Sequence, residues 1–168
     1  MDRRFAVEFV ELRERKPTLV GPATVTPFVV EHASGAPAYA LRVEYGGKVI
    51  TYSGDTEWTE NLIEAARGAD LFVCEAYFFE KKIKYHLNYQ TLRENRHRLD
   101  CRRVVLTHMG ADMLRRRSDA DMECADAGRS SCCSRVGSRA DGLFASAARG
   151  RIEHEHARER DDQLQRVP

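Results

Sequence analysis

The chain has 168 residues, of which 42% are hydrophobic and 32% charged, an ordinary composition for one globular domain. Its formal net charge of +1 argues against a strongly basic nucleic-acid surface, and no apolar run is long enough to cross a bilayer, so no membrane partner is expected. The start of the chain lacks the apolar core of a secretion signal, and its 5 cysteines form no CxxC pair. We therefore expect a cytoplasmic protein with reduced thiols.

The first part of the chain predicts antiparallel strands. Four are expected, at residues 5–10, 23–31, 38–45 and 48–53. Pro27 indicates that the second strand lies at an edge or contains a bulge. The pair Gly46-Gly47 is typical of a two-residue turn, so the third and fourth strands should form a hairpin.

The next part predicts an alternation of strands and helices. Helices are expected at 57–67, at 88–99 and from Ala111 onward, with strands at 70–75 and 103–107 between them. Gly68 is placed to end the first of these helices, and Asn88 to cap the second. Cys74 is expected to be a small core residue. This order predicts an α/β fold (α+β in some schemes), with a mixed β-sheet and helices on one face.

The composition changes near Gly128. Residues 129–168 are rich in Arg, Ala and Ser and keep no helical or strand period. We therefore expect a domain at 1–127 followed by a disordered tail at 128–168. A shifted reading frame is a second hypothesis for the tail, and an apolar strand encoded in another frame past Gly128 would support it.

Two strand ends carry candidate metal ligands. The apolar run before Gly54 is followed by Asp55, and the strand expected at 103–107 is followed by His108. A carboxylate and an imidazole at the ends of two strands suit a metal site at a sheet edge. Each has a simpler interpretation, because Asp55 could cap a helix that begins near Glu57, and His108 could be an ordinary strand-end histidine.

Four short segments, in this order, resemble the C-terminal half of metallo-β-lactamase-fold hydrolases, and most of all their ribonuclease Z-like branch. They are Ser53-Gly54-Asp55-Thr56, Phe72-Val73-Cys74-Glu75-Ala76, His86-Leu87-Asn88 and Leu106-Thr107-His108-Met109. The resemblance covers about residues 20–127. It implies half of an αββα sandwich and a hydrolase in which a metal-activated hydroxide attacks a phosphodiester, RNA included, or a small ester.

The resemblance also implies roles for single residues. Asp55 matches the carboxylate that bridges two zinc ions, and His108 matches the last histidine ligand of the second ion. Glu75 and His86 match the acid–histidine pair that protonates the leaving group. A histidine held by a carboxylate keeps one tautomer, which suits a proton donor.

The chain departs from the family in what precedes Asp55. The cluster His-x-His-x-Asp-His and a further ligand histidine are missing from this chain, and the branch's His-Ser-Thr is replaced by His86-Leu87-Asn88. We therefore expect this chain to carry half of a site. Its partner is expected to be a missing N-terminal half, or else other copies of the chain in a homo-oligomer. One face of the sheet would then have no partner layer packed against it. We assign Val43, Ile50, Phe72 and Val105 to this face.

Two other interpretations stay open. The chain could be an inactive fragment or a non-enzymatic binding module that uses the exposed sheet face or the Arg-rich tail. Alternatively, Asp55, His86 and His108 could form a mononuclear site, with His32 as a further ligand. Trp58 and the aromatic run Tyr77-Phe78-Phe79 could line a substrate cleft, although packing is the default interpretation of aromatic residues.

Overall fold

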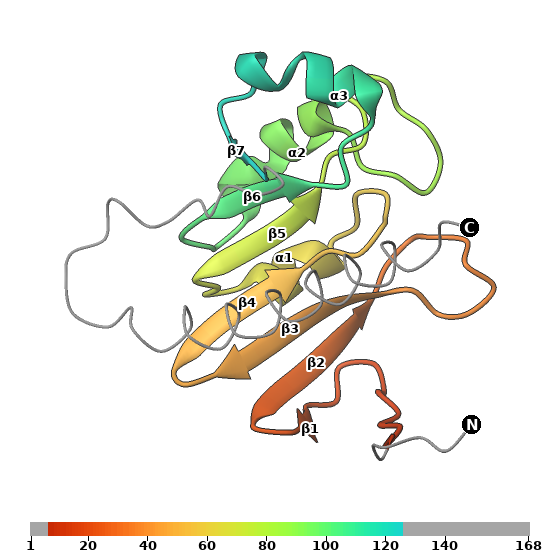
Figure 1. Cartoon of the computed structure of the whole chain (residues 1–168), viewed down its shortest axis with the longest axis vertical. Coiled ribbons are helices and arrows are strands. Elements are labelled where there is room, and N and C mark those ends of the chain that lie inside the picture. Colours follow the sequence, from red (N-terminus) through yellow and green to blue (C-terminus); the bar gives the residue numbers. More distant parts are fainter. Residues whose placement is uncertain (1–6, 126–168) are drawn as a thin grey trace, which may run out of the picture. The chain divides into compact units, whose positions relative to one another are not determined.

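The fold is built on a seven-stranded β-sheet, described for residues 7–125 in a computed structural model (Figure 1). The strands are β1 (Thr18–Val20), β2 (Ala23–Val29), β3 (Tyr39–Tyr45), β4 (Lys48–Tyr52), β5 (Leu71–Glu75), β6 (Val104–Thr107) and β7 (Glu123–Cys124). They lie side by side in the order of the chain. The predicted α/β class and mixed sheet are therefore confirmed.

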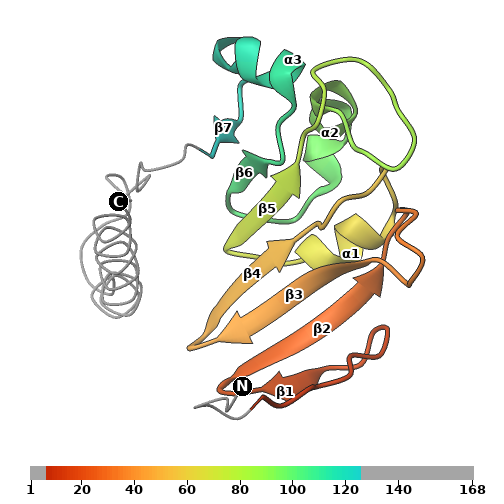
Figure 2. The ribbon, with the colours of Figure 1, turned by 45° about the vertical axis from the view of Figure 1, so that its right-hand side comes forward.

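The sheet changes direction at β4. Strands β1 to β4 pair antiparallel, whereas β4 to β7 pair parallel (Figure 2). The turn between β3 and β4 has φ values of 56° at Gly46 and 72° at Gly47. Side chains rarely adopt this left-handed conformation, which explains the glycine pair and confirms the predicted hairpin.

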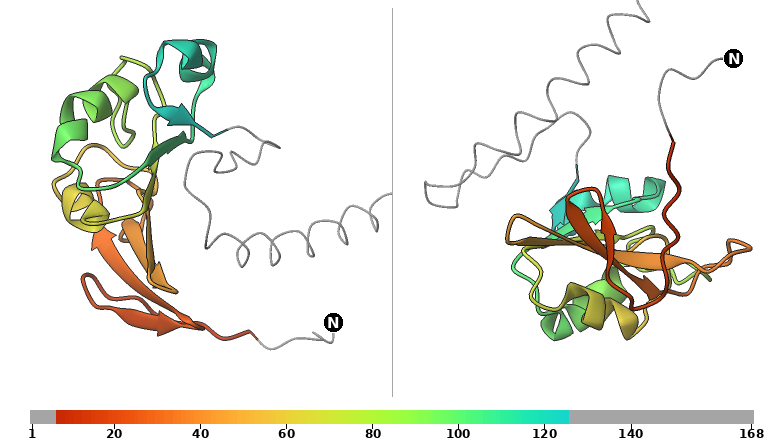
Figure 3. Two further views of the ribbon diagram at one scale, coloured as in Figure 1. Left: turned by 90° about the vertical axis from the view of Figure 1, so that its left-hand side faces the viewer. Right: turned by 90° about the horizontal axis from the view of Figure 1, so that it is seen from below.

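Three short helices join the parallel strands: α1 (Asn61–Ala66), α2 (Tyr89–Asn95) and α3 (Ala111–Arg115). Helices α1 and α2 cover the same face of the sheet (Figure 3). The side chain of Asn88 accepts a hydrogen bond of 2.7 Å from the amide of Thr91, so Asn88 caps α2 as predicted.

Helix α1 begins later than the expected residue 57. The amide of Thr56 donates to the Glu75 carboxylate, and the amide of Glu57 donates to the carbonyl of Glu31 at 3.1 Å. Residues 56 and 57 have no helical structure, and these bonds attach them to β5 and to the segment that follows β2. Asp55 consequently does not cap α1, whose N-cap residue is Glu60.

The strand expected at residues 5–10 is wrong for the part that the structure describes. Residues 7–10 form no strand, and Phe9 is 93% exposed. The place next to β2 is taken by β1, which the sequence pattern did not indicate. A segment without a neighbouring strand cannot satisfy its backbone in a sheet, whatever its propensity.

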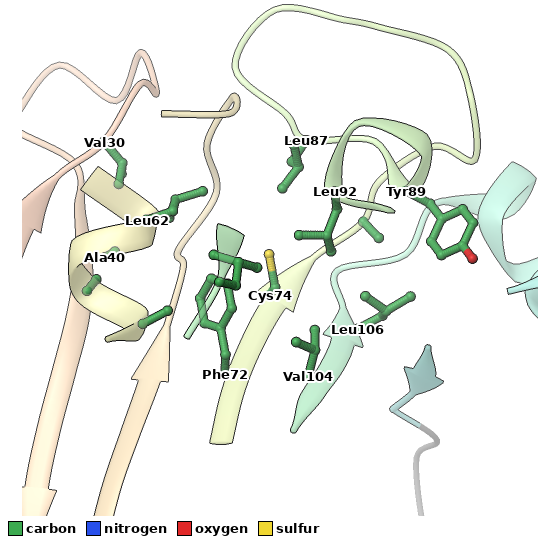
Figure 4. Close-up of a cluster of buried hydrophobic side chains, with 14 of the residues drawn as sticks. Val30, Ala40, Leu62, Phe72, Cys74, Leu87, Tyr89, Leu92, Val104 and Leu106 are labelled. Atoms are coloured by element: carbon green, nitrogen blue, oxygen red, sulfur yellow. The ribbon is translucent and has the colours of Figure 1, made fainter. Parts of the chain in front are cut away.

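The core lies between the sheet and helices α1 and α2 (Figure 4). Phe72 and Cys74 of β5 are fully buried against Leu62 of α1 and Leu92 of α2. Burial raises the pKa of the Cys74 thiol, so this group stays protonated and behaves as a small apolar side chain. Cys74 is thus the core residue that its strand predicted.

The opposite face of the sheet carries no helix from α1 or α2. Thr51 points to the helix side, where it donates a 2.8 Å hydrogen bond to the carbonyl of Ala65. Its neighbours Ile50 and Tyr52 point to the other side and are 40% and 42% exposed. We call the face that carries Val43, Ile50 and Tyr52 the uncovered face; Val43 and Ile50 are direct partners across β3 and β4.

Phe72 was expected on this face, and that expectation is wrong. Phe72 pairs with Thr51, so its side chain lies on the helix side of the sheet and is fully buried. A shift of one residue exchanges the two faces of a strand, and sequence alone did not fix the register of β5. The other expected members are placed together, because Val105 pairs with Val73 on the uncovered face.

None of the helices within residues 7–125 is long and apolar enough to span a bilayer. The tail expected at 128–168 lies wholly outside the described residues.

Candidate metal centre

The candidate site lies where β4, β5 and β6 end. Asp55 follows β4, Glu75 is the last residue of β5, and His108 follows β6. Because these strands are parallel, their carboxyl ends meet at one edge of the sheet. Open α/β sheets bind ligands at this edge. The sheet topology therefore brings together the residues that the strand ends predicted.

Asp55 and His108 face each other across this edge. Nε2 of His108 is 3.6 Å from Oδ2 of Asp55, and the side chains are 41% and 34% exposed. This separation is too long for a hydrogen bond, but it suits two donors that converge on one cation. His108 has a φ of 49°, an uncommon conformation for a residue other than glycine, and such strain clusters at functional sites.

Two glycines next to these residues allow the strand ends to pack closely. A Cβ atom on Gly54 would lie 2.9 Å from the carbonyl oxygen of Tyr39, and the φ of Gly54 is 64°. A Cβ atom on Gly110 would lie 2.8 Å from the carbonyl oxygen of Tyr77. Gly54 directly precedes Asp55, and Gly110 lies two residues after His108. A larger residue at either position would force the chain next to the site residue to move.

Glu75 and His86 form a hydrogen-bonded pair. Nδ1 of His86 is 3.0 Å from Oε2 of Glu75, whose side chain is 0% exposed. Burial raises the pKa of Glu75, and hydrogen bonds from the Thr56 amide and from His86 oppose that shift. The Glu75 amide in turn donates to Oγ of Ser53 at 3.0 Å. The pair is therefore anchored in the sheet.

A folded-back loop brings His86 to the strand ends. The amide of Tyr77 donates to the carbonyl of Leu87 at 2.9 Å, and the amide of Tyr89 donates to the carbonyl of Phe78 at 2.8 Å. These bonds close the loop between β5 and α2. One ligand atom each of Asp55, His86 and His108 consequently lies within 4.8 Å of the others.

Aromatic rings surround His86. Tyr77 stacks on it at 4.7 Å between ring centroids and also contacts the ring of His108 at 5.3 Å. His32 lies edge-on to His86 at 5.3 Å, and its Nδ1 is 3.0 Å from the carbonyl oxygen of Tyr85. Tyr77 thus packs against the site itself. His32 is close to the site, but it is outside the group of three converging ligand atoms.

The donor set fits a divalent transition metal. One carboxylate and two imidazoles are the ligands that zinc takes in many catalytic sites. The carboxylate of Glu75 against Nδ1 of His86 is the kind of outer contact that ligating histidines usually have. Sequence reasoning missed the Thr56 amide and the Ser53 hydroxyl that hold Glu75, although both belong to the segment around Asp55.

The chain is similar in sequence to several known proteins. The family model described as a beta-lactamase superfamily domain matches residues 1–109. An uncharacterised Mycobacterium tuberculosis protein is 38% identical over 64 residues, which cover 38% of this chain and 23% of that protein. A protein named ribonuclease Z from Bacillus velezensis is 31% identical over 70 residues, which cover 39% of this chain and 23% of the relative.

A solved structure shows the same fold. The metallo-beta-lactamase fold protein YhfI from Bacillus subtilis matches with a TM-score of 0.57 and 22% identity, over 68% of this chain and 51% of YhfI. The aligned part thus spans about half of YhfI and about a quarter of the two relatives compared by sequence.

Proposed function

The chain belongs to the beta-lactamase superfamily, and on that premise we propose that it carries one half of the centre of a metal-dependent hydrolase that cleaves a phosphodiester or an ester. The observation that supports this most directly is the convergence of Asp55, His86 and His108 at the carboxyl edge of the sheet. Asp55 and His108 come from separate loops, and a shared cation explains why their side chains converge, with His86 beside them to donate a proton.

In this proposal Asp55 and His108 hold the metal, which is zinc, and in a complete site they hold two ions. The metal would supply Lewis acidity and a nucleophile at neutral pH. The side chains of Asp55 and His108 are each at least one third exposed at the sheet edge, where a substrate can reach them.

Glu75 and His86 provide the proton for the leaving group. Glu75 keeps the proton on Nδ1 of His86 and fixes the orientation of the ring, so Nε2 is the atom that gives a proton to the departing oxygen. Tyr77 stacks on the ring and limits its rotation. The buried carboxylate thus acts as a positioning group, and only His86 meets the substrate.

A phosphodiester, RNA included, is the substrate class favoured by the likeness to the protein named ribonuclease Z. A small ester is the second class, because the same arrangement of metal and proton donor serves both reactions. In a complete site, the part of the longer relatives that this chain does not match would add further metal ligands and raise the rate.

Hydrolysis of two chromogenic substrates tests the function. The purified full chain is supplied with Zn²⁺ and assayed on bis(p-nitrophenyl) phosphate and on p-nitrophenyl acetate. We expect turnover that a chelator removes and that His108→Ala lowers by about 100-fold or more. His97→Ala is the matched control, because His97 is exposed on a 3₁₀ turn away from the strand ends. A turnover rate that changes neither with the chelator nor with His108→Ala would contradict the proposal.

A second candidate function is a non-enzymatic binding module. It is favoured by the uncovered face, where Ile50 and Tyr52 are 40% and 42% exposed. Apolar surface of this kind promotes association, with a second copy or with a missing half of the protein. Purified protein without bound zinc and without metal-dependent turnover would favour this candidate. Loss of self-association in Ile50→Glu, measured by sedimentation at several concentrations, would locate the contact on the uncovered face.

A further inference from the structure

The segment between β5 and α2 carries exposed side chains that the proposed mechanism does not use. We call residues 81–85 the lysine loop, whose exposed members are Lys81, Lys82, Lys84 and Tyr85. This loop directly precedes His86 and projects beyond the end of β5 (Figure 1). We infer that the lysine loop binds a single-stranded nucleic acid beside the candidate site, with a base stacked on Tyr85 and phosphates held by Lys82 and Lys84. The inference rests on the proposed function for the reaction, and it names the residues that select the substrate.

The backbone of Tyr85 is held in a strained tight turn. Its φ of 69° lies in the left-handed region, which is rare for a bulky residue. Its amide donates a 2.9 Å hydrogen bond to Oε1 of Glu57, and its carbonyl accepts one of 3.0 Å from Nδ1 of His32. Ile83 and His86 close the turn as an isolated antiparallel bridge. Strained conformations that the surroundings enforce in this way gather at ligand sites.

The ring of Tyr85 is open to a ligand. It is 41% exposed, and His32 is the one aromatic residue within 7–125 whose ring contacts it. The two ring centroids are 6.1 Å apart with an interplanar angle of 80°, an edge-to-face contact that covers at most one face of Tyr85. Every base has a π-face, so an open aromatic ring on a fixed backbone is a stacking platform for nucleic acid of any sequence.

The lysines bring positive charge that the described part of the chain does not neutralise. Neither Lys82 nor Lys84 forms an ion pair with any residue within 7–125. The ammonium group of Lys81 lies 5.2 Å from the centroid of the Phe78 ring. The acidic neighbour Glu80 is compensated by Arg116 at 3.0 Å. Ammonium groups of this kind bind phosphates by displacing the counterions of a nucleic acid, even though the net charge of the whole chain is only +1.

The position of the loop connects this binding to the candidate site. Tyr85 and His86 are adjacent in the chain, so their Cα atoms are about 3.8 Å apart. One ligand atom of His86 lies within 4.8 Å of Asp55 and His108. A base stacked on Tyr85 therefore brings a flanking phosphodiester near the imidazole that is proposed to donate the proton. A small ester has neither a base nor a second phosphate, so the lysine loop favours a nucleic acid over an ester.

Binding of a labelled oligonucleotide to the full chain tests the inference apart from hydrolysis. Fluorescence anisotropy follows a single-stranded RNA of about 10 nucleotides, with a chelator present to prevent metal-dependent cleavage. We expect Tyr85→Leu to weaken binding by about fivefold or more, whereas Tyr85→Phe keeps it because the stacking ring remains. Tyr45→Leu is the matched control, because Tyr45 is 42% exposed and pairs with Lys48 at the far end of β4 from Asp55.

The salt dependence of binding isolates the lysines. A variant with both Lys82→Gln and Lys84→Gln should reduce the slope of log affinity against log salt by about 1.4, since each contact to a phosphate of a single strand contributes about 0.7. A variant with both Lys16→Gln and Lys48→Gln removes the same charge next to β1 and at the start of β4, and it should leave the slope unchanged. Far-UV circular dichroism establishes that each variant is folded.

The outcomes separate this inference from the proposed hydrolase. Weaker binding by Tyr85→Leu together with a smaller salt slope in the double lysine variant supports the inference, even if the chain hydrolyses nothing, in which case the hydrolase proposal fails alone. If either of these folded variants binds as the wild type does, the inference is overturned, and metal-dependent cleavage of bis(p-nitrophenyl) phosphate leaves the hydrolase proposal standing. Absence of RNA binding by the folded wild-type chain also overturns the inference.

Discussion

Asp55 and His108 approach within 3.6 Å at the edge of the sheet, although they follow two strands that are not neighbours. Strand β5 lies between β4 and β6, and its last residue, Glu75, is fully buried. The parallel arrangement makes all three chain segments leave the sheet at the same edge. The candidate site is thus a product of the sheet topology.

The left-handed backbone of His108 predicts an unusual effect of glycine. At a φ of 49° a side chain costs about 1 kcal/mol or more, and glycine removes that cost. We therefore expect His108→Gly to be more stable than His108→Ala by about 1 kcal/mol, although both lose the imidazole. Urea unfolding followed by circular dichroism measures the difference.

The matched control for this pair is Arg93 on helix α2. Arg93 is exposed and helical, so Arg93→Gly should be less stable than Arg93→Ala by about 1 kcal/mol, the opposite sign. If glycine destabilised the protein at both positions, the strain assigned to His108 would be refuted.

The two faces of the sheet should respond differently to truncation. Phe72→Ala removes a fully buried ring from the core and should lower the free energy of unfolding by about 3–5 kcal/mol. Ile50→Ala on the uncovered face should cost about 1 kcal/mol or less. Chemical denaturation of both variants measures this. Equal losses would mean that the uncovered face is buried in the protein as purified.

Asp70 predicts a dependence of stability on pH. Its carboxylate accepts a 3.0 Å hydrogen bond from the amide of Val49 and lies near Lys48 and Arg102. The hydrogen bond from Val49 is the largest cause of a lowered pKa for Asp70 in the folded protein, and burial opposes it. The resulting stabilisation is present above the ordinary pKa of an aspartate and is lost as the pH falls through the lowered one.

Asp70→Asn should therefore lower stability near pH 7 by on the order of 1 kcal/mol, and the difference from wild type should shrink toward pH 2. Thermal unfolding across this pH range measures the effect. Glu94→Gln, on the exposed side of α2, is the control and should give a small difference at every pH. A difference between Asp70→Asn and wild type that is constant with pH would show that the charge of Asp70 is irrelevant.

The sequence predicted those parts of the fold that local chemistry determines. Gly46 and Gly47 need positive φ values, and Asn88 supplies an oxygen to the first free amides of α2, so the hairpin and the cap were identified from single residues. The membership in the metallo-β-lactamase fold was identified from four ordered segments, and the comparisons confirm it.

The errors concern features that distant contacts determine. The start of α1 depends on where the amides of Thr56 and Glu57 find acceptors, and these are Glu75 of β5 and Glu31 in the segment after β2. The side on which Phe72 lies depends on the register between β4 and β5. Neither piece of information is contained in the local pattern of apolar residues.

The sequence indicated which residues belong to the candidate site, but it did not indicate how those residues are arranged. Asp55 and His108 were identified as strand-end ligands, and Glu75 and His86 through the family resemblance; their roles stay predictions. The proximity of His86 to the other two depends on the backbone bonds that close the loop after β5, such as Tyr77 to Leu87. Backbone donors are the same at every position and leave no signal in a sequence.

The amide of Thr56 donates to the buried carboxylate that orients His86, and this contact provides a natural reporter. Its hydrogen can exchange with solvent deuterium only when the Glu75 contact opens. Slow exchange at this one position would mean that the loop after β4 stays bound to Glu75, and Glu75 to His86, until the sheet itself unfolds. The order of the candidate site could then be followed from a single amide, without metal or substrate.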